Sequence, residues 1–169
     1  GLLWLQIALG GWVSTNYAVL ACTGFPSCNG TWVPSLNWQG FALWRDLGHT
    51  VEGQVLPFAA LTTIHFIHRS AAWLVLAVLI SVGWRLRRVA GMQRLAQALL
   101  ILSALQLATG LSNVVLDWPL VAAVLHTGGA SALVLVLTWA LGISRSDISV
   151  SSPRTDAGER SSFDTRPAA

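Results

Sequence analysis

The stretch Thr63-Ile64-His65-Phe66-Ile67-His68-Arg69-Ser70-Ala71-Ala72 decides how this chain folds, because it places two histidines and an arginine inside an otherwise uncharged apolar run. Between Glu52 and Arg85 the only formal charge is that of Arg69. An ionised side chain at membrane depth costs roughly 2.5–3.5 kcal/mol and by default marks a functional site with a partner. We therefore predict a functional site inside a membrane-spanning helix.

The composition indicates a membrane protein. The chain is 54% hydrophobic and 10% charged, with a mean hydropathy of +0.61, whereas soluble domains average about 25% charged residues. The net charge of +3 comes from arginine alone, since the chain has no lysine. These arginines gather between apolar runs and near the C-terminus and form no basic face, so we expect no nucleic-acid partner.

Four apolar runs predict an all-α integral membrane protein, a four-transmembrane-helix bundle. We expect residues 1–143 to be one four-helix transmembrane domain, and residues 144–169, rich in Ser, Pro and Arg, to be a disordered cytoplasmic tail. The first run has no initiator Met, charged flank or cleavable signal pattern, so we expect the chain to be the later part of a longer protein. The predicted spans are 1–20, 57–84, 95–116 and 120–143.

The arginines predict the orientation in the membrane. Four of them lie in the connection 85–94, which the positive-inside rule places in the cytoplasm. The long connection 21–56 is then outside, where thiols oxidise, and we expect a Cys22–Cys28 disulfide. Residues 38–46 form either a short helix on the membrane surface or an irregular loop with interfacial tryptophans.

His126 is the expected partner of the first stretch, because it is the only other histidine in an apolar run. It lies seven residues past Pro119, as His68 lies seven past Leu61, so both sit about 10 Å inside the outer boundary. Two imidazoles from facing helices are the axial ligands that a low-spin haem iron needs. We predict that His68 and His126 bind haem iron; the alternative is two hydrogen-bonded packing histidines.

The neighbours of the two histidines leave room for a flat macrocycle. His65, one turn outward, competes with His68 as the ligand, and we prefer His68 for its depth and its small neighbours. Arg69 is predicted to neutralise a haem propionate; the alternative is that it snorkels to the outer interface. The small residues at the surrounding helical positions are Ala71, Ala72, Ala122, Ala123, Gly129 and Ala130.

A weak repeat relates the two halves of the chain. Gln6-Ile-Ala-Leu-Gly10 is echoed by Gln106-Leu-Ala-Thr-Gly110, and the two are followed by Asn16 and Asn113 respectively. Each repeat precedes a helix that carries one histidine of the pair, an arrangement that places a site between two similar halves. We expect Gln106 and Asn113, together with His65, to support the ligand histidines.

Four motifs in this order resemble the second half of the haem A synthase family, over about residues 1–143. In that family eight helices form two similar halves, and the C8 methyl of haem O is oxidised to a formyl group to give haem A for cytochrome oxidase. The resemblance implies a haem b cofactor on His68 and His126, a bacterial inner membrane, haem O as substrate, and haem O synthase and a second copy of the chain as partners. The motifs are Leu-Gly-Gly-Trp-Val-Ser-Thr-Asn-Tyr-Ala-Val-Leu-Ala-Cys22 with Phe-Pro-Ser-Cys28, Ile-His-Phe-Ile-His-Arg69, Gln-Leu-Ala-Thr-Gly-Leu-Ser-Asn-Val114 and Trp-Pro-Leu-Val-Ala-Ala-Val-Leu-His126.

One departure from the family pattern matters. The first half of the family carries a glutamate three residues before its histidine-arginine pair, where substrate oxidation is assigned, and this chain has His65 there. The resemblance thus implies an electron-transfer cofactor in this half, no catalytic residue of its own, and a substrate site in the missing half.

Two other classes of haem protein are alternatives. A transmembrane b-type cytochrome that carries electrons would usually need a second histidine pair at the opposite depth. A haem-handling or export protein would suit the tryptophan-rich outer loop, although Trp32, Trp38 and Trp44 are spread along it without a compact motif. A purely structural membrane anchor explains neither Arg69 nor the matched depths.

Overall fold

The structure of the protein is a computed structural model that describes residues 1–150, with side chains as far as Arg145. It is all-helical over this range, and no strand occurs among the described residues. Two isolated β-bridges lie in the connection 16–57. The predicted fold class is confirmed. The elements are α1 (Leu2–Thr15), the 3-10 helix η1 (Trp38–Phe41), α2 (Phe58–Leu86), α3 (Gln93–Val115) and α4 (Leu120–Val150).

Three helices are long and apolar enough to cross a membrane: α2, α3 and the part of α4 up to Arg145. The first helix is apolar but has only 14 residues, so the predicted span 1–20 is too long. Asn16 follows the last residue of α1, and both its backbone N–H and its side-chain amide donate to the Trp12 carbonyl, at 3.2 and 2.9 Å. Tyr17 then adopts a left-handed conformation with φ +57°, which turns the chain away.

The other helix boundaries follow the predicted ones closely. Pro57 precedes the first residue of α2, where its missing N–H costs nothing. The last helix was predicted to end at 143 but continues to Val150, because residues 144–150 contain neither glycine nor proline. The rest of the predicted disordered tail, 151–169, lies outside the described residues.

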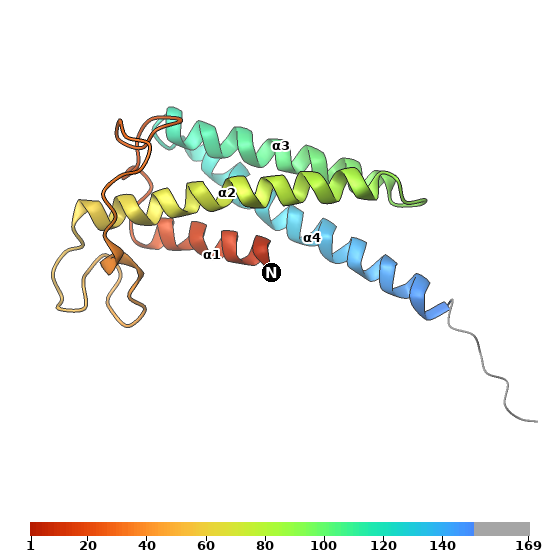
Figure 1. Cartoon of the computed structure of the whole chain (residues 1–169), viewed down its shortest axis with the longest axis horizontal. Helices are drawn as coiled ribbons and strands as arrows, with labels where there is room; N and C mark the ends of the chain where they lie inside the picture. Colours follow the sequence, from red (N-terminus) through yellow and green to blue (C-terminus); the bar gives the residue numbers. More distant parts are fainter. Residues whose placement is uncertain (151–169) are drawn as a thin grey trace, which may run out of the picture.

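Helices that follow one another in the chain pack side by side, α1 with α2, α2 with α3 and α3 with α4. Figure 1 shows the α1–α2 connection and the α3–α4 turn at one end of the bundle, and the arginine-rich α2–α3 turn at the other. One buried cluster joins the end of α1 to the start of α2. The second joins residues within α2, α3 and α4, away from the loop of residues 22–28. The second cluster consists of Val75, Leu79, Leu99 and Leu133.

The long connection between α1 and α2 is mostly irregular, and only the four residues of η1 are helical. Of the two alternatives for residues 38–46, the irregular loop is the closer, and Trp44 is 92% exposed. Arg45 fixes this loop to α1: it donates to Asn16 Oδ1 at 2.8 Å, and its guanidinium lies over the Trp12 ring. Burial lowers the pKa of Arg45 from its ordinary value.

Candidate functional site: a histidine-lined cavity

A cavity of about 800 Å³ lies between the four helices. Its volume falls within the roughly 300–1,000 Å³ of typical cofactor sites. Its wall is mostly apolar, with a few polar side chains, as such sites require. The structure brings to this one cavity the predicted site residues His65, His68, Arg69, Gln106, Asn113 and His126.

His68, on α2, is held by α1. Gln6 Nε2 donates to the backbone carbonyl of His68 at 3.1 Å and lies 3.1 Å from its Nδ1. The ring packs against the α1 backbone at Gly10, where a Cβ would lie 3.1 Å from the imidazole Cε1. The first half of the repeat thus orients this histidine.

His126, on α4, is held by α3 in the same manner. Gln106 Nε2 donates to the His126 carbonyl at 2.8 Å, and a Cβ at Gly110 would lie 3.0 Å from Cε1. In addition, Thr109 Oγ1 lies 3.0 Å from His126 Nδ1. The weak repeat in the sequence is therefore also a repeat of structure, in which a glutamine and a glycine on one helix contact a histidine on the next.

The Nε2 atoms of both histidines lack a protein partner within residues 1–150. The Nδ1 atoms of the same rings are engaged by α1 and α3. No group of three or more His, Cys, Asp or Glu side chains in the described part of the chain could hold a bare metal ion. A pair of imidazoles suits a haem iron, because the macrocycle supplies the other donors.

The cavity also contains polar atoms without partners. Gln6 Oε1, His65 Nδ1 and Asn113 Oδ1 line it, are buried and make no hydrogen bond in the described structure. Buried polar groups are nearly always paired, so each orphan requires an explanation. Two of the three are amide oxygens, which call for hydrogen-bond donors, while the apolar wall fits the ring of a ligand such as a haem.

His65 lies one turn from His68 on α2 and is only 6% exposed. Its ring also lies near the Ala18 backbone, where α1 gives way to the long connection. It is thus placed at the wall of the cavity, as the sequence predicts for a supporting residue.

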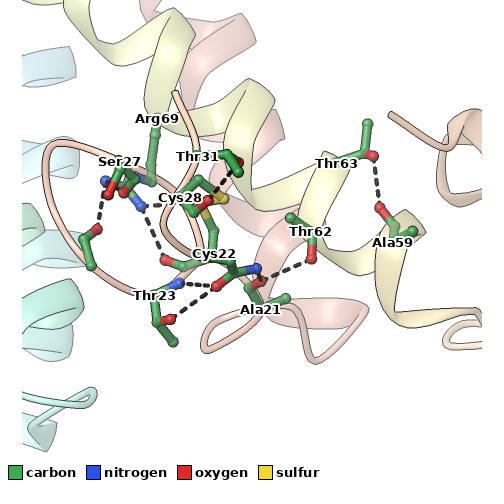
Figure 2. The surroundings of a disulfide bond; sticks show 12 residues. Ala21, Cys22, Thr23, Ser27, Cys28, Thr31, Ala59, Thr62, Thr63 and Arg69 are labelled. Carbon is green, nitrogen blue, oxygen red and sulfur yellow. Dashed lines mark hydrogen bonds between the residues drawn. A yellow bond between two sulfur atoms is a disulfide. The ribbon is translucent and has the colours of Figure 1, made fainter. Parts of the chain in front are cut away.

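Arg69 reaches out of the cavity to the disulfide loop, as Figure 2 shows. It donates to the carbonyls of Cys22 and Gly24 at 3.0 Å each and of Ser27 at 3.4 Å. The expected Cys22–Cys28 disulfide is formed, with the two Cα atoms 4.9 Å apart. Contact between Arg69 and a propionate stays a prediction, and both terminal nitrogens of the guanidinium already bind the loop.

The small residues around the histidines are divided between two roles. Ala72, Ala123 and Ala130 line the cavity. A Cβ at Gly129 would clash with Gln106 Nε2, so the absence of a side chain there admits the glutamine that binds the His126 carbonyl. Two features were missed in the sequence: the role of Gln6, which the repeat could have revealed, and that of Thr109, which breaks the repeat.

Residues 1–138 match the family described as COX15-CtaA, cytochrome oxidase assembly protein. The chain belongs to the COX15-CtaA family. Proteins named Heme A synthase are similar to it: that of Shewanella oneidensis is 41% identical over 78% of this chain, and those of Nitrosospira multiformis and Paracoccus denitrificans are 32% and 33% identical over 82% and 78%. The chain covers 40%, 37% and 32% of their respective lengths. No solved structure matches the chain significantly.

Proposed function

We propose that this member of the COX15-CtaA family is the cofactor-binding half of a haem A synthase, in which the C8 methyl of haem O is oxidised to a formyl group to give haem A. His68 and His126 would hold a haem b, which would supply one-electron transfer. The observation that carries this proposal is that two histidines, on α2 and α4, line one cavity with Nδ1 engaged and Nε2 free. Membership of the family and the named relatives support the reaction.

In this proposal the residues of the chain prepare a fixed, dry site. Gln6 and Thr109 hold the two imidazole rings from behind, and the helix backbone at Gly10 and Gly110 limits their rotation. Apolar side chains of the wall exclude water. The carboxylates of the haem would be neutralised by the charge of Arg69, which also lines the cavity.

The substrate haem O is assigned to the part of the relatives that this chain does not cover, so no catalytic residue is proposed here. Haem O synthase, which would supply the substrate, and a second copy of the chain are the proposed partners. The proposed setting is a bacterial inner membrane with the disulfide loop outside and the arginine-rich turn inside.

A reduced-minus-oxidised optical spectrum of the complete protein in detergent, with pyridine haemochrome identification, tests the cofactor. We expect a low-spin b-type haem that His68→Ala and His126→Ala each remove and that His49→Ala, in the outer loop, retains. Retention of the full signal in His126→Ala would overturn the proposed site.

The reaction is tested separately by the haems extracted from cells that produce haem O and the complete protein. Haem A is expected with the unaltered protein, and haem O alone with His126→Ala. A protein that holds haem b but yields no haem A would instead be an electron-carrying cytochrome.

A further inference from the structure

The two repeats differ at one position next to the site. Gln6-Ile-Ala-Leu9-Gly10 has a leucine where Gln106-Leu-Ala-Thr109-Gly110 has a threonine. Thr109 is 6% exposed and its hydroxyl oxygen lies 3.0 Å from His126 Nδ1. The first hairpin has no such hydroxyl, and there Gln6 faces both the carbonyl and Nδ1 of His68.

The direction of the Thr109–His126 hydrogen bond follows from an assignment of the hydroxyl hydrogen. A hydroxyl has a single hydrogen, and we assign that of Thr109 to the Leu105 carbonyl, which at 2.8 Å in the preceding turn of α3 is nearer than Nδ1 at 3.0 Å. With this assignment the oxygen presents a lone pair to His126, and Nδ1 carries the hydrogen. In a neutral imidazole Nε2 is then bare, which is the form that binds a metal.

We propose that Thr109 is a positioning residue that holds His126 in the tautomer able to bind iron through Nε2. This inference rests on the proposed function, because it requires a haem on His126. A hydrogen bond from Nδ1–H also increases electron donation by the ring, which favours the ferric state of a bound iron. Thr109 thus influences both the affinity and the potential of the cofactor.

His68 is not prepared in the same way. The Gln6 amide donates toward Nδ1, and its Oε1 is one of the unpaired buried atoms. In this arrangement Nδ1 accepts and Nε2 of the neutral ring carries the hydrogen, so His68 can bind through Nε2 only if the Gln6 amide moves away from Nδ1. The asymmetry makes Thr109, and not Gln6, the residue whose removal should act on the tautomer alone.

The test compares Thr109→Val, which keeps the shape but loses the hydroxyl, with Thr109→Ser, which keeps the hydroxyl, in the complete protein. Thr109→Val is expected to weaken haem retention roughly 10-fold or more and to shift the haem midpoint potential upward, whereas Thr109→Ser restores both. Ser112→Ala is the matched control, because Ser112 makes the same bond to a carbonyl of α3, at 2.8 Å from Ala108, but is not among the residues that line the cavity.

The inference is overturned if Thr109→Val keeps the affinity and potential of the unaltered protein, or if Thr109→Ser shows the same changes as Thr109→Val. If Thr109→Val does not fold, Thr109→Ala replaces it and is compared with Thr109→Ser by the same two measurements. His126→Ala distinguishes a failure of the proposed function from a failure of the role of Thr109. If His126→Ala retains haem b, the haem site itself is refuted. If His126→Ala loses haem b but Thr109→Val binds it unchanged, only the role of Thr109 is refuted.

Discussion

Gly110 packs directly against the imidazole of His126, so that a Cβ at position 110 would lie 3.0 Å from Cε1. Gly10 stands in the same relation to His68, at 3.1 Å. In each helical hairpin the histidine of the second helix packs against the backbone of the first helix at a glycine. Each ring is thereby confined between a glycine and the cavity.

Gly110→Ala is expected to displace the His126 ring, because a Cβ contact of 3.0 Å is tighter than most and the ring must give way by a few tenths of an ångström toward the cavity. Ligand geometry that is disturbed in this way typically weakens metal binding about 10-fold or more. The measurement is haem retention after gel filtration of the complete protein. Ala108→Val, which adds bulk at an exposed position of the same helix, is the control. Equal retention in both variants would contradict the proposed packing of the ring against Gly110.

The choice between His65 and His68 as ligand is open to direct substitution. His68 is held at Nδ1 by Gln6, whereas His65 Nδ1 has no partner among the described residues. We expect His68→Ala to lose the six-coordinate haem spectrum and His65→Ala to keep it with a shifted potential. A six-coordinate haem that survives His68→Ala and disappears in His65→Ala would assign the ligand to His65.

Much of the fold could be predicted from the sequence, because uncharged runs of about twenty residues have few alternatives to a spanning helix. The long helices were predicted to within two residues at nearly every end. The end of α1 was not predicted to this accuracy. It lies just before Asn16, whose side chain binds a carbonyl of the same helix. The last helix, α4, continues past its apolar run, because residues need not be hydrophobic to be helical.

The candidate site was partly visible in the sequence. Depth counting paired His68 with His126, since rise per residue is fixed in a helix. Contacts between helices also depend on the rotation of each helix about its axis and on its register against its neighbours. Counting residues along the chain gives neither of these. For that reason the hydroxyl of Thr109 and the direction of Arg69, toward the disulfide loop, emerge only from the structure.

Arg69→Lys is expected to loosen the disulfide loop. A guanidinium reaches three loop carbonyls at once, and an ammonium cannot reproduce this fork. Loss of one charged hydrogen bond, about 1.5 kcal/mol, makes local opening roughly 10-fold more frequent. Cys22 and Cys28 are 1% and 2% exposed, so their reduction by dithiothreitol should accelerate by about that factor. Arg85→Lys, in the turn at the other end, is the control, and equal rates in the two variants would refute the anchoring role.

The packing of α2 on α3 depends on Gly83, because a Cβ there would lie 2.7 Å from Leu100 Cδ2 and 2.8 Å from its Cγ. Alanine in a helix interior gains about 1 kcal/mol over glycine, but overpacking costs about 1–3 kcal/mol. We therefore expect Gly83→Ala to lower the free energy of unfolding by up to about 2 kcal/mol, measured by denaturant titration in detergent. The sign should reverse when the obstacle is removed: Gly83→Ala added to Leu100→Ala should stabilise relative to Leu100→Ala alone, because the new methyl then fills space that the leucine occupied. If Gly83→Ala changes the free energy of unfolding equally with Leu100 and with Leu100→Ala, then Gly83 and Leu100 do not form the packing contact between α2 and α3.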